Sequence, residues 1–128
     1  MIKVSVVKQS NYPVSVSKIK NGLKSFFLKK GIVSSAEVSV AIVGESKMLS
    51  VGKKFLGDNK VHNVLSFTPD ETKEKFVLPP DGVVHLGEII VCYPVALSEA
   101  KEENVLIDNK VYELIEHGAM HLLGFHHK

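Results

Sequence analysis

The sequence predicts an α+β fold, an α/β sandwich in which helices pack around a small mixed four-stranded sheet. Two observations support this prediction. Four apolar segments have the alternation or the length of strands, and the segments between and after them have apolar residues at helical spacing. The resulting order is strand, helix, strand, helix, strand, strand, helix, helix, which is typical of helices covering a sheet. At 128 residues and 45% hydrophobic content, residues 1–128 are expected to form a single domain.

The first half of the chain yields two strand–helix pairs. Ile2, Val4 and Val6 alternate with polar residues and predict a strand over 2–7. A helix follows, capped by Ser15 or Ser17 and closed by Gly31. The second strand is expected over 37–43 and the second helix over 45–55. Apolar residues at helical spacing predict the buried sides of the two helices: Ile19, Leu23, Phe26 and Phe27 in the first, and Met48, Val51 and Phe55 in the second.

The second half begins with a short strand over 64–67. The polar and proline-rich stretch over 69–82 is expected to be an exposed excursion, because its alternating charges suit water. A fourth strand covers 86–91, and Pro94 opens a helix that runs to about Asn104. Asp108 or Asn109 is expected to cap the last helix, which Gly124 ends.

Composition bounds the function only loosely. The net charge of +2 neither establishes nor excludes a nucleic-acid partner. The single cysteine, Cys92, lies in an apolar run, so we expect a small buried side chain and a reducing compartment. There is no apolar stretch long enough to span a membrane and no signal-peptide core. A soluble cytoplasmic protein without a membrane partner is therefore expected.

The clearest chemical signal is a histidine cluster at the end of the chain. His117 and His121 are four residues apart on the last predicted helix, so their imidazoles leave the same face. Gly124 tolerates the left-handed conformation that turns the chain back toward that face, and His127 follows three residues later. The pattern H-x-x-x-H-x-x-G-x-x-H predicts that these three histidines bind one metal ion, with Zn²⁺ favoured and other divalent transition metals possible.

Three neutral imidazoles leave the ion its full charge and an open coordination position, which is typical of a catalytic site. A metal-bound water near neutral pKa would then be the nucleophile, and no further catalytic residue is predicted. His126 is expected to line the pocket, donate a hydrogen bond or face solvent rather than act as a fourth ligand. The alternatives are surface or core histidines, or an affinity tag, although a tag normally has a longer run.

Zinc proteases share this ligand spacing, but they place a glutamate directly after the first histidine as the general base. Gly118 occupies that position here, and Glu116 lies about 100° away around the helix. No carboxylate base is therefore expected beside the three histidines, and proteolysis is not supported.

Residues 117–127, HGAMHLLGFHH, resemble the H-G-x-L-H-L-x-G-Y-D-H signature of the YbeY family of rRNA-maturation endoribonucleases. Two upstream segments are similar in the same order. Residues 63–67 resemble that family's T-D-V-L-S-F segment, and residues 86–92 resemble its L-G-D-I-x-I-c segment. The likeness spans nearly the whole chain, and it implies the same fold of helices around a mixed sheet.

The resemblance implies a metal-dependent, single-strand-specific endoribonuclease. The family acts in 16S rRNA 3′-end maturation, in 30S ribosome biogenesis and in ribosome quality control, so rRNA and the small ribosomal subunit would be partners. The family's three metal ligands correspond to His117, His121 and His127. Nothing in the sequence predicts the oligomeric state.

Two departures from the family pattern affect substrate binding. His126 stands in place of an aspartate, and Leu56 stands where the family commonly has an arginine that has been proposed to contact phosphate. Nearby lysines are candidates to supply the charge, although they lack the bidentate guanidinium. Asn63 and Ser66 either line the cleft or are satisfied polar groups at a strand end. The candidate substrate-binding residues are Lys53, Lys54, Lys60, Asn63 and Ser66.

Two other functions are compatible with the same residues. One is a metal hydrolase that acts on a peptide or a small molecule. The other is a non-catalytic ribosome-assembly factor in which a structural metal holds the C-terminus.

Overall fold

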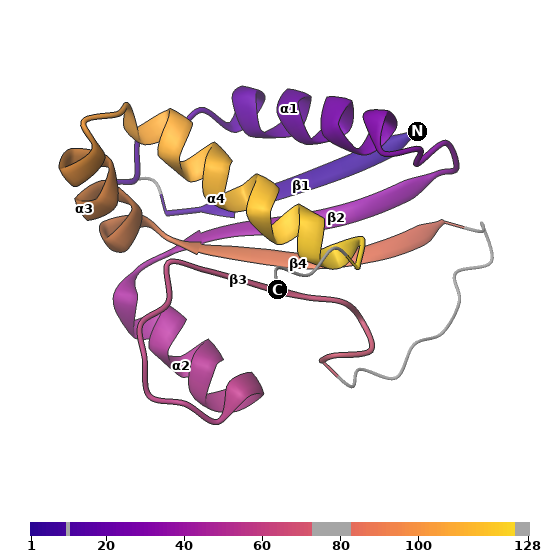
Figure 1. Ribbon diagram of the computed structural model, residues 1–128. Helices are drawn as coiled ribbons and strands as arrows, with labels where there is room; N and C mark the ends of the chain where they lie inside the picture. The colour runs from indigo at the N-terminus through magenta and orange to yellow at the C-terminus, as the bar shows by residue number, and fades with distance from the viewer. Residues whose placement is uncertain (10, 73–82, 125–128) are drawn as a thin grey trace.

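The computed structural model describes residues 1–9, 11–72 and 83–124, and its elements follow the predicted order (Figure 1). His126 and His127 lie outside these ranges. The bounds of the elements are β1 Ile2–Lys8, α1 Val16–Lys29, β2 Ala36–Val43, α2 Glu45–Leu56, β3 Val64–Phe67, β4 Val84–Cys92, α3 Tyr93–Glu103 and α4 Ile107–Leu122.

The four strands form one mixed sheet in the order β1-β2-β4-β3. β1 pairs with β2 and β2 pairs with β4 in parallel, whereas β3 pairs with β4 in antiparallel. The short strand β3 therefore lies at an edge of the sheet although it precedes β4 in the chain. The α+β prediction with a mixed four-stranded sheet is confirmed.

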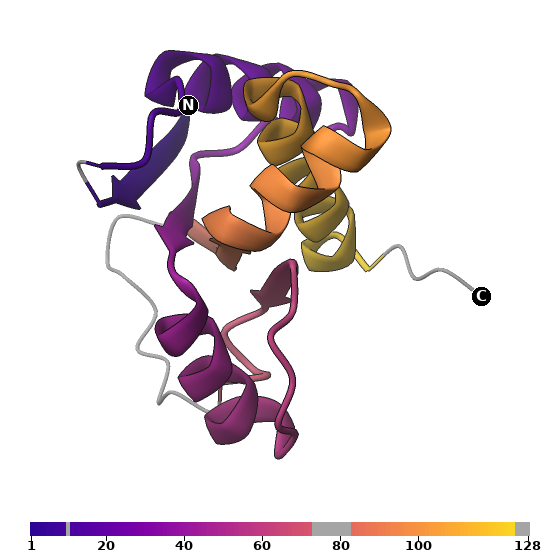
Figure 2. The same ribbon diagram turned by 90° about the vertical axis from the view of Figure 1, so that its left-hand side faces the viewer.

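Helices cover both faces of the sheet. α1, α3 and α4 gather on one side, while α2 lies on the other (Figures 1 and 2). The larger core lies between the sheet and the helices α1 and α4, and is built around fully buried side chains such as Leu23, Phe27 and Ile115. A smaller core beneath α2 contains Met48 and Cys92. Cys92 is fully buried, and burial raises the pKa of its thiol.

The helix ends follow local chemistry, with one correction. Ser15 caps α1, as predicted, and its hydroxyl accepts a hydrogen bond from the Lys18 amide at 3.2 Å. The prediction that Asp108 or Asn109 caps the last helix is wrong, because α4 begins at Ile107 and its cap residue, Leu106, offers no side-chain bond. The Asp108 carboxylate instead accepts a hydrogen bond from the Ser15 amide at 2.8 Å, which joins the starts of α1 and α4.

Gly87 lets β3 approach β4 where the sheet is irregular. Its φ is +135°, which side-chain-bearing residues rarely adopt, and a Cβ there would collide with the Phe67 carbonyl oxygen. The register of β4 against β2 shifts at this point. No helix within the described ranges is long and apolar enough to cross a membrane.

Candidate metal centre

A cleft of about 250 Å³ opens where the C-terminal half of α4 lies over β3. Its walls come from α2, β3, the turn after β3, and α4. The lining residues are Leu56, Val64, Leu65, Ser66, Phe67, Glu71, His117, Gly118 and His121. Residues far apart in the sequence thus form one site, because β3 occupies the sheet edge that α4 crosses.

His117 and His121 line this cleft together, one helical turn apart on α4. This confirms that the two histidines share a face. His117 is exposed, and the side chain of His121 is 32% exposed. Both rings are therefore accessible to an ion from solvent.

Gly118 sets the distance between α4 and the sheet. A Cβ at this position would lie 2.9 Å from Ile89 Cγ2 and 3.3 Å from Ser66 Cβ, so the helix backbone packs directly on β3 and β4. The residue after His117 therefore faces the core. A glutamate there, as in the zinc proteases, would clash with the sheet instead of reaching the cleft.

A carboxylate nevertheless stands beside the histidines. The Glu71 Oε1 and Oε2 atoms lie 3.1 Å and 3.3 Å from His121 Nε2. The expectation that no carboxylate lies near the histidine cluster is wrong for this reason. Burial by itself raises the pKa of Glu71, but hydrogen bonds from the Thr68 amide and from His121 together hold it below its ordinary value. Glu71 is thus held in the charged form.

The turn after β3 orients Glu71. The Thr68 hydroxyl accepts from the Glu71 amide at 3.4 Å, and the Glu71 carboxylate accepts from the Thr68 amide at 2.9 Å. This reciprocal pair is the capping-box arrangement, whose T-x-x-E pattern is visible in the sequence. That pattern was the available signal for a fixed carboxylate in a segment expected only to be exposed.

The third predicted ligand lies outside the described residues. Gly124 has φ +85° and its amide donates to the His121 carbonyl at 2.9 Å, so the predicted left-handed turn after α4 is confirmed. His126 and His127 follow it beyond the described part of the chain. Within residues 1–9, 11–72 and 83–124, no group of three or more His, Cys, Asp or Glu side chains is arranged to hold a metal.

The donors that are described fit part of a transition-metal site. Two imidazoles on one helix face, open to solvent, match the ligand preference of zinc and of related divalent ions. A metal that bound His121 through Nε2 would have to replace its contact with Glu71. The described residues thus offer two candidate nitrogen ligands and one adjacent carboxylate.

The substrate-binding predictions divide into two groups. Ser66 lines the cleft next to the histidines. Asn63 does not line it: its amide donates to the Glu99 carboxylate at 3.2 Å, and its Oδ1 accepts from the Val64 amide at 2.7 Å. Of the two alternatives predicted for Asn63, the structure thus supports a polar group that is satisfied by hydrogen bonds at the start of a strand.

The predicted lysines lie around α2 rather than in the cleft. Lys53 and Lys54 are exposed on the last turns of α2, and Lys60 is exposed in the loop that follows. Lys54 Nζ lies 5.1 Å from the centroid of the Phe55 ring. Leu56, which stands where the resembled pattern has an arginine, is 49% exposed and does line the cleft. Sequence reasoning also missed the apolar wall of Val64, Leu65 and Phe67.

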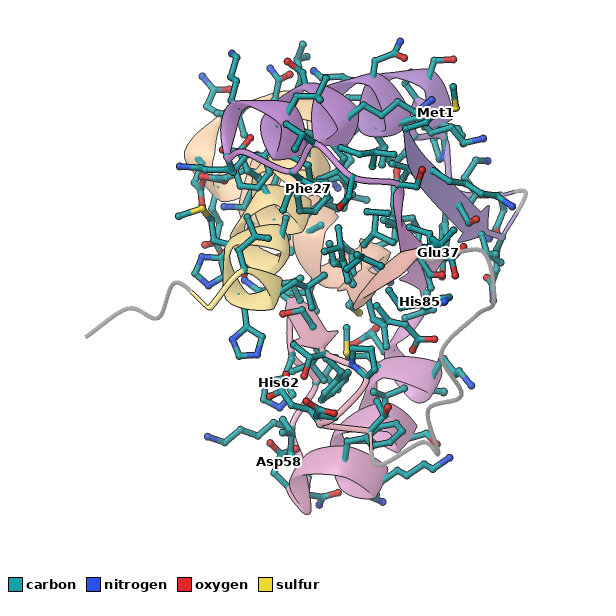
Figure 3. All side chains as sticks on the ribbon, turned by 90° about the vertical axis from the view of Figure 1, so that its right-hand side faces the viewer. Met1, Phe27, Glu37, Asp58, His62 and His85 are labelled. Atoms are coloured by element: carbon teal, nitrogen blue, oxygen red, sulfur yellow. The ribbon has the colours of Figure 1, made fainter. Side chains whose placement is uncertain are left out.

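His62 and Asp58 form a separate pair below the sheet, near the end of α2 (Figure 3). Their side chains are 2.7 Å apart. Burial by itself raises the pKa of Asp58, but the hydrogen bonds from His62 and from the Lys60 amide together hold it below its ordinary value. Neither residue lines the cleft.

Comparison with known families gives one consistent result. The family model described as Endoribonuclease YbeY matches residues 5–128. The Endoribonuclease YbeY of Wigglesworthia glossinidia brevipalpis is 32% identical over 114 residues, which cover 88% of this chain and 69% of that protein. The Endoribonuclease YbeY of Francisella philomiragia is 28% identical over 127 residues, which cover 98% of this chain and 78% of that protein.

A solved structure supports the same relationship. The solution structure of TM1509 from Thermotoga maritima aligns with all of this chain and with 75% of its own, at a TM-score of 0.57 and 25% sequence identity. The arrangement of helices around the mixed sheet is therefore shared with a solved protein.

Proposed function

The chain belongs to the YbeY endoribonuclease family, and we propose that it is a metal-dependent endoribonuclease specific for single-stranded RNA. Its proposed role is 16S rRNA 3′-end maturation, with further parts in 30S ribosome biogenesis and quality control in the cytoplasm. The proposed cofactor is one Zn²⁺ ion held by His117, His121 and His127. The proposed partners are rRNA and the small ribosomal subunit.

One observation carries this proposal. His117 and His121 line the same cleft as Ser66, which lies on the edge strand β3. The cleft is shallow enough for both rings to stay accessible and lies in the two segments, β3 and the end of α4, that resemble the family pattern. A single-stranded phosphodiester can reach such an open site.

Each residue of the cleft has a proposed task. The two imidazoles, as neutral nitrogen donors, hold the ion and leave its charge for the substrate. Bound zinc supplies a Lewis acid that stabilises the negative charge developing on the phosphodiester. The Ser66 hydroxyl is placed to donate a hydrogen bond to a phosphate oxygen. If the ion is held through His121 Nδ1, Glu71 would keep its hydrogen bond from Nε2 and fix the orientation of that ring.

The charge that attracts the RNA backbone comes from lysine alone. All sixteen basic residues of the chain are lysine, so no guanidinium is available to bind a phosphate in a bidentate manner. Lys53, Lys54 and Lys60 stand near the cleft end of α2 and are proposed to provide long-range attraction rather than direct contact.

A second candidate function is favoured by Glu71. A carboxylate beside a metal site can serve as a general base, as in hydrolases of peptides or small molecules. The family relationship favours RNA as the substrate. A cleavage assay with RNA and with peptides distinguishes the two functions. Zinc-loaded protein should cut single-stranded RNA and leave unstructured peptides intact. Cleavage of peptides without cleavage of RNA would favour the second candidate.

The experiment that tests the proposal compares two histidine variants. Zinc-loaded wild-type protein is incubated with single-stranded RNA, beside His121→Ala and the matched control His85→Gln. His85, on β4, pairs with Glu37, on β2 (Figure 3), and neither residue lines the cleft. We expect His121→Ala to lose at least a hundredfold in rate, chelated wild type to lose the same, and His85→Gln to stay within about twofold. Equal cleavage by both variants would refute the metal-nuclease proposal.

The cellular role is tested separately. Cells depleted of this protein and supplied with wild type or with His121→Ala are compared by mapping the 3′ ends of 16S rRNA. Extended 3′ ends should persist with the variant and disappear with the wild type. Correct 3′ ends in both would remove the proposed rRNA role while leaving the nuclease activity intact.

A further inference from the structure

The strand β1 leaves one edge of the sheet open. It is the outermost strand, in indigo in Figure 2, and no described strand other than β2 pairs with it. The Ala36 amide donates to the Met1 carbonyl at 3.1 Å, so the odd-numbered residues of β1 bond to β2. The amides and carbonyls of Ile2, Val4 and Val6 therefore point away from the sheet. Such a row of main-chain groups is a template for pairing with another strand.

An apolar hollow adjoins this edge. It has a volume of about 370 Å³, lies between the start of β1 and the second half of α1, and is lined by Met1, Ile2, Lys24 and Leu28. Met1 is 94% exposed and Leu28 is 60% exposed, so neither side chain belongs to the core. The hollow has room for one large apolar side chain from a strand laid along β1. We call the free edge of β1 and this hollow the β1 edge surface.

The charge around the β1 edge surface is positive. Residues 1–28 contain no acidic residue and five lysines, namely Lys3, Lys8, Lys18, Lys20 and Lys24. Lys20, Lys24 and Leu28 follow one another at four-residue spacing, so they share one side of α1. Neither Lys20 nor Lys24 pairs with a carboxylate in the described parts of the chain. Glu37, which is next to β1 in the register, lies on the opposite face of the sheet from α1.

Three other kinds of occupant fit this surface less well. A second copy paired through β1 would bring the lysines of two α1 helices together without an acidic residue between them. RNA would find lysines, but no aromatic ring on which to stack is among the described residues that line the hollow. A membrane would cover the main-chain groups of the open edge without replacing their hydrogen bonds to water.

We propose that the β1 edge surface docks an extended, acidic segment of a partner protein. The segment adds to the sheet as a further strand beside β1, inserts one apolar side chain between Met1 and Leu28, and pairs its carboxylates with Lys20 and Lys24. The cleft lies at β3, on the opposite edge of the sheet, so the docked segment leaves the candidate metal centre open. This inference goes beyond the proposed function and gives a role to β1 and α1, which take no part in the cleft.

The test measures the binding of fluorescent peptides to the full chain by anisotropy. The first peptide, L-T-E-T-E-T-L, has the seven residues of β1 and places its leucines and glutamates on one face of a strand. A matched peptide replaces both glutamates with lysine. Two further versions of the acidic peptide carry N-methyl groups on one or on the other alternate set of main-chain amides. In a paired strand only one of these sets points to β1.

The acidic peptide should bind about tenfold more tightly than its lysine counterpart, because only the acidic one forms ion pairs. Methylation of one alternate set of amides should weaken binding about tenfold through lost main-chain hydrogen bonds. Methylation of the other set should leave binding within about twofold of the unmethylated peptide.

Variants of the protein locate the binding surface. Lys20→Ala/Lys24→Ala should weaken the acidic peptide about fivefold, and Lys47→Ala/Lys101→Ala, which removes two exposed lysines from α2 and α3, should leave it unchanged. Leu28→Asp should weaken it about tenfold, because the hollow loses an apolar wall and gains a like charge. The control for this change is Leu106→Asp, at a 72% exposed leucine between α3 and α4.

Amide hydrogen exchange shows whether the peptide lies on the edge of β1. In the free protein the amides of Ile2, Val4 and Val6 should exchange faster than those of Lys3 and Ser5, which bond to β2. Saturation with the acidic peptide should slow the first set and leave the second unchanged.

Failure of the acidic peptide to bind, equal binding of the lysine peptide, or equal effects of the two methylated sets would overturn the inference. Protection of Ile2, Val4 and Val6 that rises with protein concentration without peptide would assign the edge to a second copy instead. Single-stranded RNA or phosphatidylglycerol vesicles that bind wild type but not Leu28→Asp, without any binding of the peptide, would assign it to RNA or to lipid. None of these measurements depends on cleavage, so their failure is distinct from failure of the nuclease proposal.

Discussion

At the scale of single residues, Gly118 explains both the position and the chemistry of the cleft. Its missing side chain allows α4 to lie against Ile89 and Ser66, which places His117 and His121 over β3. The same contact excludes the glutamate that zinc proteases carry at this point. Gly118 therefore determines how closely α4 approaches the sheet, and it leaves no room for the glutamate base of the zinc proteases.

We predict that Gly118→Ala lowers the free energy of unfolding by about 1–2 kcal/mol, because overpacking against the branched Ile89 side chain exceeds the gain in helix propensity. Chemical denaturation measures this directly. Asn21→Ala, on the exposed face of α1, is the control and should leave stability equal or slightly higher. A Gly118→Ala protein as stable as wild type would show that α4 can move away from the sheet without cost.

Leu56 stands on the cleft wall where the family pattern that the sequence resembles commonly has an arginine. We predict that Leu56→Arg strengthens binding of single-stranded RNA, because Leu56 is 49% exposed on the cleft wall and an arginine there can reach a phosphate. The slope of log K against log salt should steepen by about 0.7. Leu28→Arg adds the same charge on exposed α1 outside the cleft and should have the smaller effect. Equal gains from both variants would indicate general attraction only.

At the scale of elements, α3 and α4 are joined by a cluster around Lys110. The Lys110 side chain is only 8% exposed, and its Nζ lies 2.9 Å from carboxylate oxygens of both Glu103 and Glu113 and 3.6 Å from one of Glu99. Glu99 in turn accepts from Asn63 at the start of β3. The hydrogen bonds that Lys110 donates to Glu103 and Glu113 raise its pKa above the ordinary value.

We predict that Lys110→Met destabilises the protein by about 1–3 kcal/mol at neutral pH, because the carboxylates lose their shared cation. Since the folded pKa of this lysine is raised, its contribution is fully present below the ordinary value of 10.5 and is lost as pH rises through the higher folded value. The stability gap between wild type and variant should therefore narrow at strongly alkaline pH. A gap that stays constant there, or an equal loss in the exposed control Lys101→Met, would contradict this account.

At the scale of the whole molecule, the order of elements could be predicted from periodicity because each helix and strand has its own apolar pattern. The strand order β1-β2-β4-β3 could not, since nothing local in residues 64–67 specifies pairing with the outer edge of β4. The start of α4 was misplaced for a similar reason: Asp108 bonds to Ser15, which is distant in sequence.

In the candidate site, too, the features set by local sequence could be predicted and those set by tertiary contacts could not. His117 and His121 could be paired from sequence because one helical turn fixes their relative position, and Ser66 could be joined to them through the family pattern. Glu71 could not, because its contact with His121 depends on how the turn after β3 meets α4. The positions of Lys53 and Lys54 depend on the tertiary placement of α2, so their distance from the cleft was not accessible to pattern reasoning.

The central claim is that the cleft over β3 holds a catalytic metal through the histidines of α4. Its most direct test is a crystal structure of the zinc-loaded protein with anomalous data collected on both sides of the zinc absorption edge. We predict one anomalous peak in the cleft, about 2.0–2.1 Å from a ring nitrogen of both His117 and His121. A fully loaded protein with no peak at ligand distance from these two histidines, or with its peak beside His85 and Glu37, would contradict the account.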